Sequence, residues 1–209
     1  MAYPGTPAML ILRSSPSSPF GRKAKLAAAE LGLDGLLLIE NTETVVPAEA
    51  FLRQNPLGKI PVLITEDGQA LYDSRVILEY LDHRAGGGKL LPADARRFDV
   101  LTMQALADGI CDAAVVMTYE KRFRPEEFHY QPWLDRQQDK VSRALAVANA
   151  RPPEMGTTLD AGCIALACAL GYLDLRYEGA WRKDHPGLVA WLEEFSARLP
   201  AFERTTVQP

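Results

Sequence analysis

The chain contains few of the residues from which disulfide frameworks and metal centres are built. Among 209 residues there are three cysteines and three histidines, and no two cysteines form a CxxC pair. An odd number of cysteines without such a pair argues against a disulfide scaffold, and the isolated histidines lack metal-ligand spacing. All three cysteines lie in apolar helical patterns. We therefore expect buried, reduced thiols, no metal, and a cytoplasmic protein.

Charge and hydropathy exclude two further classes of protein. The net charge is −4 and there is no long basic run, which argues against a nucleic-acid-binding protein. No stretch approaches the run of about 20 apolar residues that crosses a membrane. The residues up to Pro7 also lack the basic segment of a secretory signal. We expect no nucleic-acid partner and no membrane partner.

The first part of the chain alternates between strand and helix patterns. Ser18 followed by Pro19 is typical of a helix start, Asp67-Gly68 is a strong hairpin signal, and Ser74 predicts the N-cap of a further helix. The predicted strands cover residues 9–12, 36–39, 60–65 and 69–72, and the predicted helices cover 19–31, 47–53 and 74–84. Both of the first two strands are predicted to be buried. The order βαβα followed by ββα predicts a mixed four-stranded sheet covered by helices.

The second part of the chain shows helical patterns and no strand signal of comparable strength. The predicted helices cover residues 95–123, 131–149 and 161–175, with a last helix after His185. The run 161–175 is nearly all apolar, so it should form the buried centre, and Thr157 with Asp160 predicts a capping box at its start. The sequence thus predicts an α/β domain over 8–84, a linker over 85–94 that opens with three glycines, and an all-helical domain over 95–206.

The stretch Asn55–Leu63 is the most informative part of the chain, because Pro61 is the second residue of a predicted strand. Proline cannot donate to a sheet ladder. One explanation is a cis Ile60–Pro61 bond, a geometry found in about 5–6% of X–Pro bonds, which would turn a backbone edge outward. That edge could then pair with a small peptide. The alternative is a trans proline on an edge strand.

Several motifs in a fixed order resemble the glutathione S-transferase superfamily. They are Ser17-Ser-Pro-Phe-Gly-Arg-Lys23, Asn55–Leu63, Asp73-Ser74, Thr157–Asp160, the segment from His185 to Leu192 and the segment from Arg198 to Thr205. The resemblance covers roughly residues 8–206 and is closest to bacterial members with a Ser-Pro-Phe turn. It implies a thioredoxin-like first domain with a cis proline, a helical-bundle second domain, and a homodimer paired through the helices around 74–84 and 95–119.

The resemblance also implies the chemistry, in which glutathione is the cosubstrate and its thiolate attacks a small electrophile. Ser18 occupies the position where the omega and beta branches carry cysteine, and its hydroxyl would donate a hydrogen bond to the sulfur. Ser17 is the second choice, and Ser14 and Ser15 lie close by. A serine cannot form a mixed disulfide, which weighs against disulfide reduction. The alternative role for Ser18 is that of a helix N-cap only.

Further glutathione contacts follow from the same resemblance. Ser74 at a helix N-terminus would hold the γ-glutamyl carboxylate, where free N–H groups favour an anion, and Asp73 would hold the amine. Ile60 would pair through its backbone, and Lys59 would meet the glycyl carboxylate or else be an ordinary solvated lysine. The implied glutathione-binding residues are Phe20, Lys59, Ile60, Pro61, Asp73 and Ser74.

The electrophile pocket has no motif. Tyr119, Arg122 and Phe123 end the first long helix of the second domain and are candidates for lining it, although helix-end packing and solvation is the favoured interpretation. Arg22 and Lys23 could steer an anionic ligand, but a solvated helix face is the favoured interpretation. Two functional alternatives remain: a non-catalytic glutathione-binding or regulatory protein, and a glutathione-dependent peroxidase, dehalogenase or isomerase.

Overall fold

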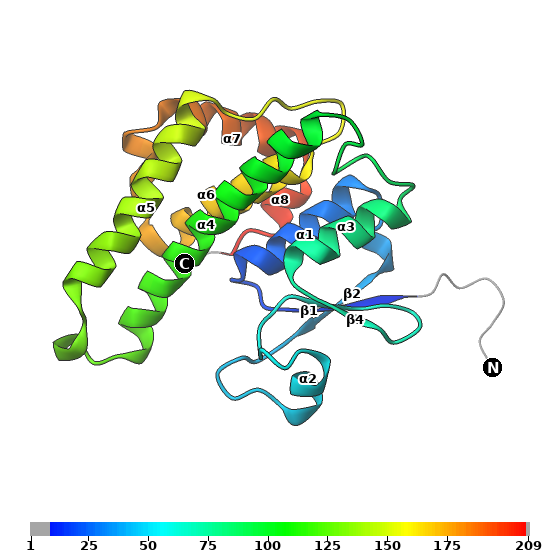
Figure 1. Cartoon of the computed structure of the whole chain (residues 1–209), viewed down its shortest axis with the longest axis horizontal. Helices are drawn as coiled ribbons and strands as arrows, with labels where there is room; N and C mark the ends of the chain where they lie inside the picture. Colours follow the sequence, from blue (N-terminus) through cyan, green and yellow to red (C-terminus); the bar gives the residue numbers. More distant parts are fainter. Residues whose placement is uncertain (1–8, 208–209) are drawn as a thin grey trace.

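The first domain is built on a four-stranded mixed sheet. The structure is a computed structural model in which residues 9–207 are described (Figure 1). The strands are β1 (Leu10–Ser14), β2 (Leu37–Asn41), β3 (Val62–Ile64) and β4 (Ala70–Leu71), in the spatial order β2-β1-β3-β4. β1 pairs in parallel with β2 and antiparallel with β3, and β3 pairs antiparallel with β4. Helices α1 (Pro19–Glu30) and α3 (Ser74–Arg84) cover one face, and α2 (Glu49–Gln54) lies on the other side.

The second domain is helical, as the sequence predicts. Its helices are α4 (Arg96–Phe123), α5 (Gln131–Ala150), α6 (Ala161–Tyr177), α7 (Pro186–Arg198) and α8 (Ala201–Arg204). α4 and α5 run side by side, and α6 lies behind α4 in the view of Figure 1, where it packs against both α4 and α1. An α/β domain followed by a helical domain is the predicted fold class, and it is confirmed.

Helix α6 is the centre of the molecule because it is apolar on every side. Its residues from Ala161 to Leu170 are all buried, and it makes the most extensive helix–helix contact, with α4. On the sheet side it packs against α1, whose fully buried Ala24, Ala27 and Ala28 allow the two helices to approach closely. A helix that is hydrophobic all round needs neighbours on every side. The burial predicted for 161–175 is confirmed.

Helix α4 is long and apolar enough, by length and composition alone, to cross a membrane. It contains an 18-residue window with a mean hydropathy of 1.5, and 50% of that window is buried inside the protein. The helix packs against both α5 and α6. These contacts identify it as a core helix.

The predicted burial of the second strand is wrong. β2 lies at the edge of the sheet with β1 as its one strand neighbour, and Leu38 and Ile39 are 48% and 50% exposed. An apolar run predicts a strand, but it does not say whether the strand lies at the centre or the edge of the sheet.

Two predicted helix caps are also wrong. The N-cap of α3 is Asp73 rather than Ser74, and its carboxylate accepts a hydrogen bond from the N–H of Arg75 at 2.9 Å. The N-cap of α6 is Asp160 rather than Thr157, and its carboxylate accepts from the N–H of Cys163 at 2.9 Å. In both sequences a hydroxyl and an acid lie close together, and the acid is the stronger partner for a free helix N–H.

The segment predicted as a linker is held to the end of α3 by one buried carboxylate. Asp82 accepts hydrogen bonds from the N–H groups of Gly88, Lys89 and Leu90 at 3.0, 2.9 and 2.8 Å. The carbonyl of Leu90 in turn accepts from the N–H of Ala161 at the start of α6. The glycines allow the positive φ angles that this turn needs, up to 103° at Gly86. The crossing between the domains is therefore ordered.

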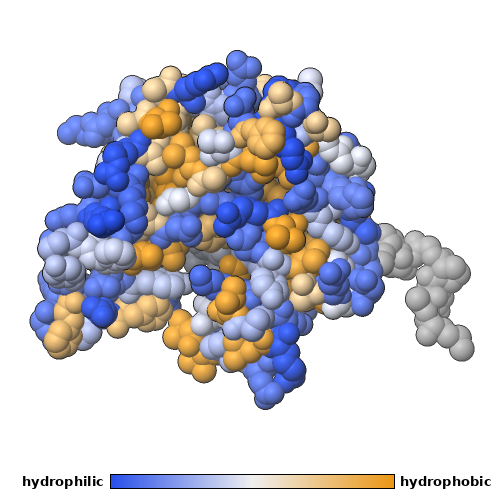
Figure 2. Space-filling model, in the orientation of Figure 1, coloured by the Kyte–Doolittle hydropathy of each residue, from blue (hydrophilic) through white to orange (hydrophobic). Residues whose placement is uncertain are grey.

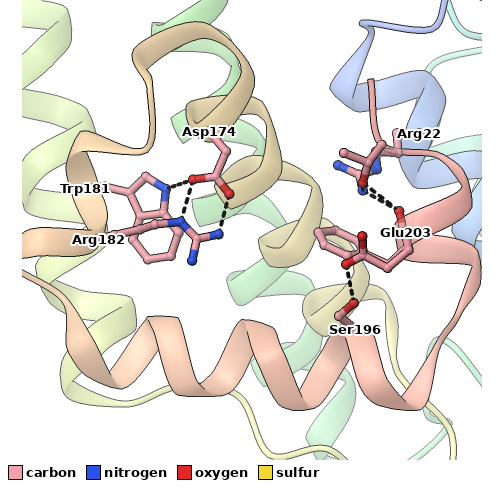
Figure 3. Close-up of polar contacts among 8 residues, drawn as sticks. Arg22, Asp174, Trp181, Arg182, Ser196 and Glu203 are labelled. Atoms are coloured by element: carbon pink, nitrogen blue, oxygen red, sulfur yellow. Dashed lines mark hydrogen bonds and ion pairs between the residues drawn. The ribbon is translucent and has the colours of Figure 1, made fainter. Parts of the chain in front are cut away.

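Arg22 and Lys23 of α1 are buried, which corrects the favoured interpretation of a solvated helix face. Lys23 is 1% exposed in its side chain, and its Nζ lies 2.6 Å from Oδ1 of Asp108 on α4. Arg22 donates from Nε to Thr205 Oγ1 at 3.0 Å and from Nη2 to the carbonyl of Phe202 at 2.6 Å. Burial lowers the pKa of Arg22. The close view shows Arg22 pointing at the chain of α8 (Figure 3).

We predict that Asp108→Ala strongly lowers the free energy of unfolding, by about 3–5 kcal/mol, because it leaves the Lys23 ammonium buried without a counter-charge. The measurement is urea unfolding. The double variant Lys23→Met with Asp108→Leu should recover most of the loss, since an apolar pair can replace a buried ion pair. Asp139→Ala, at an exposed position of α5, is the control and should change stability by less than about 0.5 kcal/mol. Equal effects of Asp108→Ala and Asp139→Ala would contradict the prediction.

Candidate functional site

A cleft of about 510 Å³ lies between the two domains. On the sheet side its wall is formed by residues 15–20 at the start of α1, by 41–45 after β2 and by 58–60 before β3. Side chains of α4 and α6 form the opposite wall. This volume lies within the range of small-molecule sites.

The outer rim of this cleft on the sheet side is apolar. Figure 2 shows apolar side chains gathered over the α2 segment, at the bottom of the view. The exposed apolar residues of this segment are Val45, Val46, Leu52 and Leu57. Val45 also lines the cleft.

Most of the residues predicted for the site lie in this one cleft. Those that line it are Ser17, Ser18, Phe20, Lys59, Ile60, Tyr119 and Arg122. Pro61, Asp73, Ser74 and Phe123 do not line it. The cleft thus brings together residues of the two predicted domains that are up to about 100 positions apart in sequence. The motif Asp73-Ser74 at the start of α3 lies outside the lining of the cleft.

Ser18 sits at the N-terminus of α1, facing the cleft. Its Oγ accepts a hydrogen bond from the N–H of Gly21 at 3.1 Å, which makes it the N-cap of the helix. The hydroxyl proton is not used in that bond, so it can be donated to a ligand atom. The free N–H groups and the macrodipole of a 12-residue helix also favour an anion at this position. The cap role and a ligand-binding role are therefore compatible.

The neighbouring serines differ in their access to the cleft. Ser15 and Ser17 line it, whereas Ser14 is fully buried and its hydroxyl donates to the carbonyl of Ser15 at 3.3 Å. A Cβ atom at Gly21 would lie 2.0 Å from the Ser14 hydroxyl, so the first turn of α1 packs directly over Ser14. Ser14 is therefore excluded as a residue that could donate a hydrogen bond to the sulfur of glutathione.

A buried side-chain amide shapes the sheet-side wall around Ile60. Asn55 is 1% exposed; its Nδ2 donates to the carbonyl of Lys59 at 2.7 Å, and its Oδ1 accepts from the N–H of Leu57 at 3.1 Å. The Ile60–Pro61 peptide bond is cis, the geometry expected from the sequence. No hydrogen bond to the N–H or C=O of Ile60 occurs within the part of the chain that the structure describes. A backbone edge at Ile60 is therefore open for pairing.

At the start of α3, the Ser74 side chain is less accessible to a ligand than the sequence suggested. Ser74 is 2% exposed, while Asp73 is exposed and its carboxylate bonds Arg75 through the backbone N–H and through Nη2 at 3.1 Å. Partial burial opposes the charge on Asp73, but the hydrogen bonds and positive charge of Arg75 outweigh it, so the pKa of Asp73 is lowered. The carboxylate stays ionised at neutral pH.

Three residues that the sequence analysis missed also line the cleft: Asp112 on α4, and Tyr172 and Arg176 on α6. Burial, together with the nearby carboxylate of Asp108, raises the pKa of Asp112. Burial raises the pKa of Tyr172 as well. The i, i+4 spacing of Tyr172 and Arg176 places them on one helix face, but sequence alone does not say which face meets the cleft.

A second, smaller cavity of about 300 Å³ lies behind the start of α1 and shares Ser17, Ser18 and Tyr172 with the cleft. Its polar groups are largely satisfied within the protein (Figure 3). Asp174 accepts from Trp181 Nε1 at 2.9 Å and from Arg182 Nη2 at 2.6 Å. We assign these contacts to the packing of α6 against the segment that follows it.

Comparison with known proteins identifies the family. Residues 12–89 match the family model of the glutathione S-transferase N-terminal domain, and residues 131–194 match that of the C-terminal domain. The chain is 36% identical over 201 residues to the "Uncharacterized GST-like protein YibF" of Escherichia coli K12, a match that covers 93% of this chain and 96% of that protein. The chain belongs to the glutathione S-transferase family.

Solved structures of the family are similar to this transferase-family chain over nearly its whole length. A glutathione transferase family member from Pseudomonas fluorescens Pf-5, solved with bound glutathione, is 45% identical with a TM-score of 0.88, covering 96% of this chain and 99% of that chain. A glutathione S-transferase from Methylobacterium radiotolerans, in complex with glutathione sulfonate, is 32% identical with a TM-score of 0.86, covering 96% of each chain.

None of the three cysteines of this family member lines the cleft. Cys111, Cys163 and Cys168 are buried and free, which confirms the expected core thiols. Burial raises the pKa of Cys168 to about 12 and raises the pKa values of the other two as well. Because only the thiolate is a strong nucleophile, a reactive sulfur in the cleft has to come from a ligand.

We predict that none of the three thiols reacts with an aromatic disulfide reagent at pH 8 in the folded protein, because burial blocks access and keeps each group protonated. The reaction is followed by absorbance. The same sample in guanidinium chloride should release three equivalents of thiolate and serves as the control. One fast equivalent in the folded protein would contradict the assignment of all three to the core.

Proposed function

We propose that this chain is a cytoplasmic glutathione transferase that binds glutathione in the interdomain cleft and activates its thiol for attack on a small electrophile. The observation that carries the proposal is that the Ser18 hydroxyl at the start of α1 and the open backbone edge of Ile60 line the same cleft. Family membership supports it, as do related structures that contain glutathione or glutathione sulfonate.

The proposed roles use the chemistry of each group. Ile60 pairs with the cysteinyl backbone of glutathione, and Pro61 holds that edge in place. Lys59, an exposed cation at the cleft wall, meets the glycyl carboxylate. Phe20 packs against the ligand from the first turn of α1. We assign the γ-glutamyl end to Asp73 and to the backbone of Ser74, which lie at the start of α3 and outside the lining of the cleft.

The proposed chemistry depends on the pKa of a thiol. A free thiol has a pKa of about 8.5, so only a few per cent is ionised at neutral pH. A hydrogen bond from the Ser18 hydroxyl and the field of the α1 N-terminus both stabilise the thiolate. Each unit of pKa lowering corresponds to about 1.4 kcal/mol. The sulfur then forms a bond to the electrophilic carbon, the leaving group departs with its electron pair, and the thiol proton passes to solvent.

Calorimetric titration with glutathione tests the proposal. We expect saturable binding with a stoichiometry of one per chain, and turnover of 1-chloro-2,4-dinitrobenzene. The absence of binding at millimolar glutathione in a folded sample would overturn the proposal. Binding without turnover of any electrophile would favour a non-catalytic glutathione-binding protein, and activity with peroxides or haloacids alone would assign a different glutathione chemistry.

Ser18→Ala should lower kcat/KM about 10- to 100-fold, because a hydrogen bond to a charged group is worth about 1.5–3 kcal/mol. The pKa of the bound thiol, measured from thiolate absorbance in the ultraviolet, should rise. Ser18→Thr keeps the hydroxyl and should retain most of the activity. Ser17→Ala tests the second-choice donor, and Ser142→Ala, at an exposed serine of α5 outside the cleft, is the control. Removal of the cap costs stability too, about 1 kcal/mol, so unfolding is measured in parallel. An unchanged thiol pKa in Ser18→Ala would remove Ser18 from the mechanism.

We also propose a homodimer paired through α3 and α4. Val76 on α3 and Phe98 on α4 are 45% and 74% exposed. The start of α4 lies beside the middle of α3, since Arg97 Nη2 lies 2.9 Å from Glu79 Oε1. Exposed apolar side chains gathered on one face are typical of interfaces.

Phe98→Glu should shift the protein from dimer to monomer in sedimentation velocity, because it introduces a charge into an apolar interface. Phe128→Glu, at an exposed aromatic residue between α4 and α5, is the control and should leave the mass unchanged. A wild-type protein that sediments as a monomer would contradict the proposal.

A further inference from the structure

Two arginines from different helices line the same cleft. Arg122 lies near the end of α4 and Arg176 near the end of α6. Neither guanidinium forms an ion pair with a carboxylate within residues 9–207. Eight of the other 14 arginines form ion pairs. Two guanidinium groups without an ion pair on one wall of a cleft leave unused capacity for an anion.

The carboxylates that line the cleft form no ion pair with these arginines. Glu43 accepts hydrogen bonds from the backbone N–H groups of Thr44 and Val45, both at 2.7 Å, so its carboxylate is held by its own loop. These backbone hydrogen bonds and, to a smaller extent, the charge of Arg122 lower the pKa of Glu43. The charges of Arg75, Lys59 and Lys23, all in the first domain, oppose the rise in the pKa of Asp112. The wall of α4 and α6 therefore keeps a positive excess.

An apolar surface adjoins the two arginines. Val115, Tyr119 and Arg122 recur at i, i+4 and i+7 along α4 and line the cleft together. The ring of Tyr119 is braced edge-on by Phe123, with 5.1 Å between ring centroids. A flat apolar group lying on Tyr119 would thus have a guanidinium at one end. Ser17 and Ser18 line the opposite wall, where the sulfur of glutathione is proposed to lie.

We propose that the electrophile taken by this cleft is a small organic acid, with a carboxylate bound by Arg122 and Arg176 and an apolar body packed on Val115 and Tyr119. The inference rests on the proposed function and deepens it by naming the substrate class. Arginine suits this role because its planar group donates two parallel hydrogen bonds to a carboxylate. The carboxylate end is held away from Ser18, which leaves the reactive carbon facing the sulfur.

The test compares two electrophiles that share a ring and a leaving group but differ in charge: 4-chloro-3-nitrobenzoate and 4-chloro-3-nitrobenzamide. In both, the sulfur of glutathione forms a bond to the ring carbon that carries chlorine, chloride leaves with the bonding pair, and the thiol proton passes to solvent. Each kcat/KM is divided by the uncatalysed rate constant with glutathione, which removes the difference in intrinsic reactivity. We expect this normalised value to be at least about tenfold higher for the acid, and the ratio to fall with added salt.

Arg122→Gln and Arg176→Gln test the two residues. Each should lower the acid-to-amide ratio about threefold or more, because a charge-assisted hydrogen bond is lost, and the double variant should bring the ratio to about one. Arg143→Gln, at an exposed arginine of α5 outside the cleft, is the control and should keep the wild-type ratio. A wild-type ratio near one, or Gln variants that lower acid and amide turnover equally, would overturn the inference.

Calorimetry distinguishes this failure from failure of the proposed function. A protein that binds no glutathione overturns both. If glutathione binds but neither electrophile turns over, the product S-(4-carboxy-2-nitrophenyl)glutathione is compared with its carboxamide by direct binding. The inference is supported if the carboxylate product binds more tightly than the carboxamide and if Arg122→Gln and Arg176→Gln abolish this difference. Equal binding of the two products overturns it.

Discussion

The buried ion pair between Lys23 and Asp108 is the constraint on which the geometry of the cleft depends. Lys23 lies on α1, the helix whose N-terminus carries Ser18, and Asp108 lies on α4, the helix that carries the opposite wall. A buried charge without its partner is very unfavourable, so displacing one helix from the other would leave two such charges. The pair thereby holds the two domains in the one arrangement that closes the cleft.

The two walls of the cleft differ in the groups that they offer. The sheet side presents backbone and helix-terminus groups: the open edge of Ile60, kept in shape by Asn55, and the first turn of α1 beside Ser18. Such groups suit a peptide, which has its own backbone to pair. The helical side presents side chains, among them Tyr119 and two arginines. Side chains can be exchanged without altering a helix, so this wall is where substrate preference can vary while the fold is kept.

The sequence predicted the elements well where the signal is local. The hairpin around Asp67-Gly68, the start of α1 at Pro19 and the apolar run of α6 all correspond to the structure. Ser18 and Ile60 were found because each belongs to a short motif, and they do line one cleft. Predictions of whether a side chain is buried or exposed were less accurate. Two charged residues of α1 proved buried, and two apolar residues of β2 proved exposed, because burial is set by neighbours that are distant in sequence.

What the sequence by itself determined is the order of strands and helices, the positions of turns, and the segments that have to be buried. These follow from hydrophobic period, from proline and glycine, and from capping residues, which act over a few positions. The tertiary structure alone decided which helix faces meet. Lys23 and Asp108 are 85 positions apart, and Arg122 and Arg176 lie on different helices of the second domain. No local pattern couples such residues; they are brought together because the apolar surfaces of α1, α4 and α6 can be buried only against one another.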